Sequence, residues 1–112
     1  MSGWIGVDLD GTLAKYDHWR GIEHVGDPIP RMLNRVKAWI NEGKTVKIFT
    51  ARASVPDEML EEVKAPIEAW CIGHGLPKLE ITCKKDFGMI ELYDDRCFRV
   101  KMNTGEIVGE NS

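Results

Sequence analysis

Three short apolar segments, each followed at once by acidic or hydroxyl side chains, limit the fold of this chain more than any other feature. The first, residues 4–9, contains Asp8 near its end and is followed by Asp10, and the second, residues 45–50, ends in Thr50. The third, residues 90–93, precedes Asp94 and Asp95. Apolar runs of this length, bounded by polar and glycine residues, are typical of buried β-strands. The sequence therefore predicts a sheet whose strands carry reactive groups at their carboxyl ends.

Helical patterns fill the spaces between these strands. Pro28 and Pro30 open a first helix, and Gly43 ends it. Ser54 and Asp57 form a capping-box pattern that predicts the start of a second helix. The expected inner faces are Leu33, Val36 and Ile40 in the first helix, and Met59, Leu60, Val63, Ile67 and Trp70 in the second.

The alternation of strand and helix predicts an α/β fold. Because such units use right-handed crossovers, we expect a three-layer, Rossmann-like sandwich with a mainly parallel central sheet and helices on both faces. A further strand is expected at residues 79–82, and a hairpin over residues 97–108. Residues 11–27 lack a clear period and are expected to form a short β-flap after the first strand. Ligands of such sheets bind at the carboxyl ends of the strands, where the acids and Thr50 converge.

Length and composition limit the protein to one domain, residues 1–112. A chain of 112 residues with 43% hydrophobic content buries one core and has no room for a cap domain. Its net charge of −3 argues against a broad basic surface for nucleic acid. No signal-peptide pattern or membrane-length apolar run is present, and three widely spaced cysteines fit reduced thiols. We therefore expect a cytoplasmic protein without a membrane partner.

The acidic residues at the strand ends suit a divalent cation. Side chains two residues apart on a strand share one face, so Asp8 and Asp10 are expected to lie together. Asp94 and Asp95 join them from another strand. An oxygen-only set of this kind favours Mg²⁺ over zinc.

A phosphoryl group held at this rim would give each residue a role. Asp8 can attack phosphorus and form an aspartyl-phosphate. Asp10 can protonate the leaving oxygen and then take a proton from the hydrolytic water. The Thr50 hydroxyl and a lysine from Lys84-Lys85 can bind the phosphoryl oxygens.

These residues resemble the four ordered motifs of the haloacid dehalogenase superfamily. Asp8-Leu9-Asp10-Gly11-Thr12 matches the first motif, Thr50 the second, Lys85 the third and Asp94-Asp95-Arg96 the fourth. The resemblance implies that Asp8 is the nucleophile and that Asp10 is the acid/base, contacting the metal through its backbone carbonyl. It favours Asp94 as the outer metal ligand, with Asp95 as the alternate, and Lys85 over Lys84. A response-regulator receiver, the nearest other class, would need an acid in place of Thr50.

The resemblance also implies a Mg²⁺-dependent phosphomonoester hydrolase. Without a cap, the open site either accepts a bulky substrate or takes a lid from a neighbouring subunit of a homo-oligomer. We expect a small sugar phosphate or similar phosphometabolite as the substrate. The alternatives are phosphate ends of nucleic acids and a catalytically silent binding module. Residues 15–20 of the flap either contact the leaving group or fold on themselves around Trp19. Arg52 and Arg96 either reach a second phosphate or pair with acids at the rim.

Overall fold

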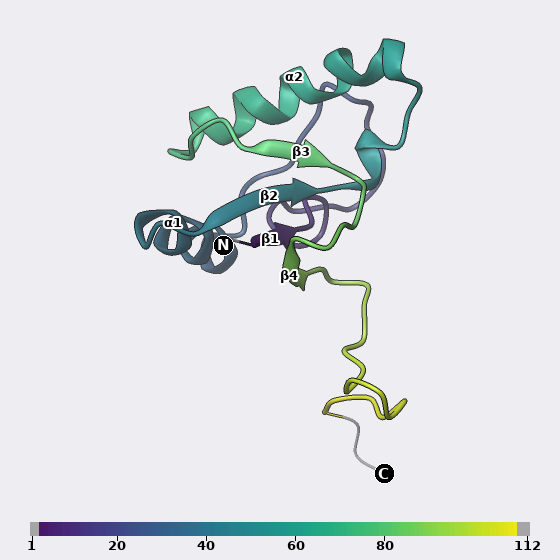
Figure 1. The fold of residues 1–112 in the computed structure, drawn as a ribbon. Coiled ribbons are helices and arrows are strands. Elements are labelled where there is room, and N and C mark those ends of the chain that lie inside the picture. The colour runs from purple at the N-terminus through teal and green to yellow at the C-terminus, as the bar shows by residue number, and fades with distance from the viewer. Residues whose placement is uncertain (1–2, 110–112) are drawn as a thin grey trace.

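The protein forms one four-stranded, all-parallel sheet with two α-helices (Figure 1). We analysed it as a computed structural model, which describes residues 3–109. The strands lie in the order β3-β2-β1-β4. Their bounds are β1 Trp4–Val7, β2 Thr45–Phe49, β3 Glu80–Thr82 and β4 Met89–Tyr93. The prediction of a small Rossmann-like α/β fold is confirmed.

Strand β1 lies between β2 and β4, so both of its edges are hydrogen bonded. All four of its residues are buried, as expected for an apolar run in a central parallel strand. Ile5 pairs with Val46 and Val7 with Ile48, which puts these four side chains on one face of the sheet. The same pairing brings the carboxyl ends of β1, β2 and β4 to a common rim.

Helix α1, Pro30–Asn41, connects β1 to β2. Pro30 occupies its first turn, where a missing N–H costs no helical hydrogen bond. Leu33 and Val36 are buried as predicted, together with Met32. Gly43 follows the helix with a φ of 84°, a left-handed conformation that glycine adopts without strain.

Helix α2, Asp57–Gly73, connects β2 to β3 after a short 3₁₀ turn, η1 (Ala51–Ala53). The predicted capping box is wrong: Pro56 is the residue before the helix, and no side chain caps it. Val63 and Ile67 are buried as predicted. Met59, predicted for the inner face, is exposed instead, because it lines an open pocket.

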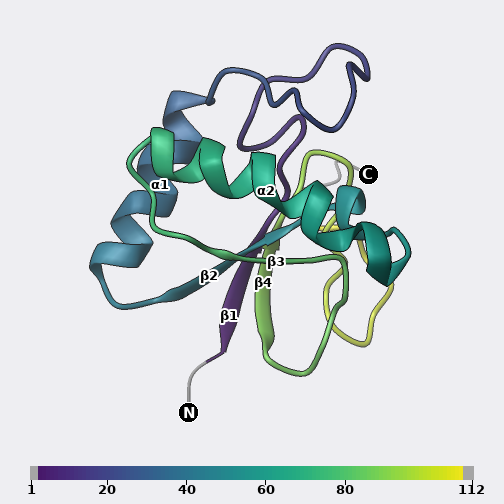
Figure 2. The same ribbon diagram turned by 90° about the horizontal axis from the view of Figure 1, so that it is seen from above.

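Both helices pack on the same face of the sheet, which differs from the expected three layers (Figure 2). The chain moves from β1 to β2 to β3 in one direction, and two right-handed crossovers in one direction place their helices on one side. The connection from β3 to β4, residues 83–88, contains no helix. Within residues 3–109 no helix covers the opposite face, where Trp4 stacks on Phe49 at 6.5 Å, lies under Lys47 at 4.5 Å and donates to Asp86 at 2.8 Å.

The excursion between β1 and α1 is an ordered loop. It contains isolated bridges from Ala14 to Asp10 and to Pro28, so the predicted β character of the flap is reduced to these contacts. Lys15 N–H donates to the carbonyl of Asp27 at 2.8 Å and closes a loop of residues 15–27. From here on, the flap means residues 15–27 of the predicted segment 11–27.

The chain after β4 extends away from the sheet (Figure 1). The predicted hairpin is present in a short form: Val100 and Ile107 form an antiparallel bridge, and Asn103 adopts a φ of 65° at the turn. Neither helix in the described part of the chain is long and apolar enough to cross a bilayer.

Candidate active site

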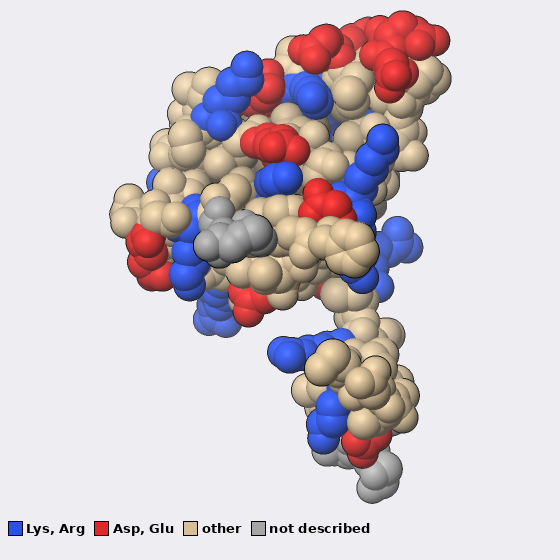
Figure 3. All heavy atoms as spheres, viewed as in Figure 1, with Lys and Arg blue, Asp and Glu red and all other residues tan. Residues whose placement is uncertain are grey.

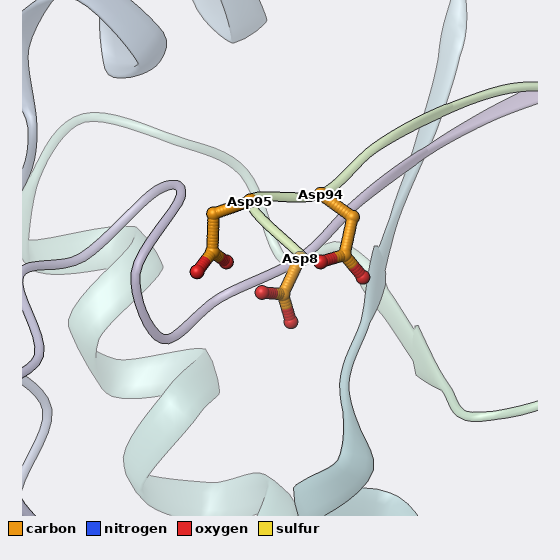
Figure 4. Close-up of side chains that lie close together, drawn as sticks. All are labelled: Asp8, Asp94 and Asp95. Atoms are coloured by element: carbon orange, nitrogen blue, oxygen red, sulfur yellow. The ribbon is translucent and has the colours of Figure 1, made fainter. Parts of the chain in front are cut away.

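Three carboxylates meet at the rim where β1 and β4 end (Figure 4). One oxygen each from Asp8, Asp94 and Asp95 lies within 4.8 Å of the others. Figure 4 shows the three carboxylates side by side, with Asp8 from the chain after β1 and the other two from the chain after β4. We call these residues the acid cluster. The expected convergence of strand ends thus brings together three of the predicted metal ligands.

The backbone after β1 places Asp8 against the end of β4. Its N–H donates to the carbonyl of Tyr93 at 2.9 Å, which continues the pairing of the two strands. Gly11 then turns the chain with a φ of 92°. A Cβ at Gly11 would lie 2.8 Å from a carboxylate oxygen of Asp95, so glycine is required both for the turn and for the close approach.

Thr12 connects the two halves of the acid cluster. Its hydroxyl lies 2.9 Å from Asp95 Oδ1 and 3.5 Å from Asp8 Oδ2, and it accepts a hydrogen bond from the Asp95 N–H at 2.9 Å. The sequence motif contained Thr12, but no role followed from the sequence. Its position in the motif was the only available signal, since the contact with residue 95 depends on the tertiary fold.

Asp8 carries a strongly perturbed carboxyl group. Burial raises its pKa to about 7, helped by a hydrogen bond with Asp95 and by the charges of Asp94 and Asp95. A proton shared with Asp95 therefore relieves the repulsion in the acid cluster. Partial burial of Asp95 raises its pKa, but hydrogen bonds from Thr12 and Asp8 outweigh this effect and leave the pKa below its ordinary value.

The acid cluster fits Mg²⁺ by its donor chemistry. Its ligands are three carboxylates with no nitrogen or sulfur donor among them, which is the set that hard cations prefer. The proton on Asp8 reduces the negative charge of the acid cluster, and a bound cation could balance that charge instead. We therefore infer that a divalent cation, when bound, would lower the pKa of Asp8.

Asp10 lies apart from the acid cluster and pairs with Arg52. Arg52 Nε and a terminal nitrogen donate to the two oxygens of Asp10, each at 2.8 Å. The Arg52 side chain is 6% exposed and that of Asp10 is 21% exposed. The interpretation that Arg52 pairs with a rim acid is thus the one the structure supports, and Asp10 could reach a metal only through another of its atoms.

Thr50 lies at the end of β2 and is 2% exposed. Its N–H donates to the carbonyl of Thr82 on β3, and its hydroxyl accepts a hydrogen bond from the N–H of Arg52 at 3.1 Å. The hydroxyl proton remains available to another acceptor. Thr50 lines the same cleft as Asp8 and Asp10, as the sequence predicts.

The predicted phosphate-binding lysines lie elsewhere. Lys84 and Lys85 are both exposed, and neither belongs to the lining of the cleft that contains the acid cluster. Lys84 borders a smaller pocket beside Ser54 and Thr82. In their place, Arg52 and Arg96 are the cations that line the main cleft.

The cleft is open and has a volume of about 1010 Å³. Its lining combines the acid cluster, Asp10, Thr50 and the two arginines with apolar residues of the flap and α2. Figure 3 shows basic side chains interspersed with acidic ones on the viewed face, with acids gathered over the start of α2, where Asp57 and Glu58 lie. No continuous basic area appears on that face of the described residues.

Comparisons with known proteins show similarity in fold. No protein-family model matches the chain, and no curated protein matches it in sequence. One solved structure, described as a conserved protein coded by a locus from Bacteroides thetaiotaomicron, is similar with a TM-score of 0.57. The two share 20% identity over 87% of this chain and 78% of the other. At this identity the similarity supports the α/β fold and says nothing of the chemistry.

Proposed function

We propose that the protein is a Mg²⁺-dependent phosphomonoester hydrolase. The observation that carries the proposal is the acid cluster, in which Asp8, Asp94 and Asp95 bring oxygens within 4.8 Å of one another at the carboxyl edge of a parallel sheet. Thr50 and two arginines line the same cleft and supply groups that bind phosphate oxygens. An anion with three terminal oxygens, presented together with a cation, matches this combination.

Asp8 is the nucleophile in this proposal. Its carboxylate oxygen attacks phosphorus and forms an aspartyl-phosphate, and the bond from phosphorus to the leaving oxygen breaks. Burial and the nearby charges of Asp94 and Asp95 raise the pKa of Asp8 to about 7, so in this proposal its carboxylate is a better nucleophile than an exposed one once its proton leaves. Water then attacks phosphorus, which restores the Asp8 carboxylate and releases inorganic phosphate.

Asp10 transfers the proton. For this role one Asp10 oxygen leaves its bond to Arg52 and carries a proton, which it gives to the leaving oxygen and then regains from the attacking water, while the second Arg52 bond holds the carboxylate in place. The Thr50 hydroxyl donates to a phosphoryl oxygen. Asp8 and Asp94 or Asp95 would hold Mg²⁺, which when bound neutralises charge so that one anion can approach another.

The free cysteines fit a protein that works in a reducing compartment. All three cysteines are free, and burial raises the pKa of the Cys71 thiol to about 11, with a smaller effect from Glu68. We place the enzyme in the cytoplasm, where such thiols stay reduced.

Hydrolysis of p-nitrophenyl phosphate with Mg²⁺ or with EDTA tests the function. We expect turnover that stops in chelator and in the Asp8→Asn variant. A matched control is Asp57→Asn, which changes an exposed acid at the start of α2 outside this cleft. Mass spectrometry of the quenched enzyme should find a phosphoryl group on Asp8. Full activity of Asp8→Asn, or of the wild type in chelator, would refute the mechanism.

A further inference from the structure

We propose that Trp19 is the binding platform for a planar ring in the leaving group of the substrate. This inference rests on the proposed function, because it assigns a substrate class to the same cleft. It favours phosphomonoesters that carry an aromatic ring or a nucleobase over simple sugar phosphates.

Trp19 is fixed in the cleft from one side. Its ring lies 4.8 Å from the guanidinium carbon of Arg52, a cation–π contact. Arg52 is itself held by the two oxygens of Asp10 and by the carbonyls of His24 and Ile22, at 2.9 Å and 3.5 Å. One face of the ring therefore lies on a buried group that is itself held in place.

The ring also remains available to a ligand. Trp19 is 52% exposed although it lines the cleft that contains the acid cluster, so a large part of its surface remains open to solvent. The interpretation that the flap packs around Trp19 as an anchor requires a buried ring. The observed exposure instead fits a side chain that stacks on a ligand.

Many apolar side chains line the cleft together with its charged groups. A sugar is recognised through several hydrogen bonds to its hydroxyl groups, whereas Arg52, the charged group in contact with Trp19, is already paired with Asp10. Among the described residues, the hydroxyl groups that line the cleft are those of Tyr16, Thr50 and Ser54. The apolar lining residues are Trp19, Ile22, Phe49, Val55, Met59 and Val63.

The test compares two substrates that differ only by the ring. Adenosine 5′-monophosphate and ribose 5-phosphate carry the same phosphate on the same sugar carbon. A stacked base contributes about 1–3 kcal/mol, which is a preference of roughly 5- to 150-fold in kcat/KM. We expect this preference in the wild type, a fall towards unity in Trp19→Leu, and an intermediate value in Trp19→Phe. Phe98→Leu, at an exposed ring of the tail outside the cleft, is the control and should keep the preference.

A third substrate distinguishes the source of the ring. In p-nitrophenyl phosphate the ring is attached directly to the ester oxygen and the leaving group is more reactive than a sugar alcohol, so only a preference for it that Trp19→Leu removes indicates an aryl phosphate site rather than a nucleotide site. Equal kcat/KM for the ring-bearing and ring-free substrates, or an unchanged preference in Trp19→Leu, overturns the proposal. The failure of all three substrates to react refutes the hydrolase function instead. The platform is then judged by calorimetric affinities of the same ligands, where a ring preference lost in Trp19→Leu supports it and its absence in the wild type overturns it.

Discussion

Removal of the Arg52 side chain should destabilise the protein far more than removal of an ordinary surface arginine. Arg52 makes two charge-assisted hydrogen bonds to Asp10 and two to flap carbonyls. Fully exposed ion pairs contribute about 0–1 kcal/mol, whereas breaking a buried pair costs about 3–5 kcal/mol. With side chains 6% and 21% exposed, the Arg52–Asp10 pair lies nearer the buried limit. We expect Arg52→Ala to lower the free energy of unfolding by about 2–4 kcal/mol.

The flap offers a matched control. Arg20 also pairs with an aspartate, Asp17, but these side chains are 45% and 63% exposed. Water solvates both charges in the folded state, so Arg20→Ala should leave stability unchanged within experimental error. Since both changes delete an arginine from an Arg–Asp pair of the same region, the difference between them measures what burial and the additional flap contacts of Arg52 contribute.

Urea unfolding followed by circular dichroism measures the free energy of unfolding of both variants, and thermal unfolding measures their Tm. For a domain of this size, a loss of 2–4 kcal/mol corresponds to a fall in Tm of about 8–16 °C. Arg52→Ala should also speed amide hydrogen exchange in residues 15–27, because two carbonyls and the Trp19 ring of the flap lose their partner. An Arg52→Ala protein no less stable than Arg20→Ala would refute the reasoning that this pair holds the flap to the rim.

Three further predictions concern the acid cluster. Burial and neighbouring charges raise the pKa of Asp8 to about 7 in the folded state, above its ordinary value of 3.8. Between these two pH values the folded state without Mg²⁺ binds more protons than the unfolded chain, so stability should fall as pH rises through this range. Mg²⁺ should raise Tm more above pH 7 than below it, as thermal scans at several pH values will show. Thr12→Val removes the hydroxyl between the carboxylates and should weaken Mg²⁺ binding about tenfold by calorimetry, whereas Thr104→Val in the tail should not. Gly11→Ala combines a positive φ with a contact on a carboxylate, so it should weaken folding by about 1–3 kcal/mol and also weaken Mg²⁺ binding. Gly21 has a similar φ but open space around it, so Gly21→Ala should weaken folding alone. Equal Mg²⁺ affinities of the two variants would contradict the geometry.

The sequence predicted the elements whose local signals agree with their packing. The apolar run of β1, the proline start of α1 and the acids after β4 each carried a signal within a few residues. Because parallel strands bring their carboxyl ends to one edge, these local signals were sufficient to place Asp8, Asp94 and Asp95 together.

The sequence could not predict features that depend on where a connection runs. The alternation of strands and helices suggested layers on both faces, but the face of a helix depends on the spatial order of the strands, and here both crossovers run the same way. Lys84 and Lys85 follow β3 at the expected distance along the chain, yet the loop that carries them leaves the cleft. Similarly, the Arg52–Asp10 pair joins residues 42 positions apart, which no local pattern specifies.

Arg52 joins several parts of the proposed site. The proposed hydrolase needs its acid/base oriented and its leaving group held. Here one side chain contacts the Asp10 carboxylate, the Trp19 ring and two flap carbonyls. We propose that these contacts couple the flap to Asp10, so that a ligand stacked on Trp19 also orders the proposed acid/base. If this coupling operates, Trp19→Leu should lower kcat as well as raise KM for a ring-bearing substrate, whereas a platform that only binds would change KM alone.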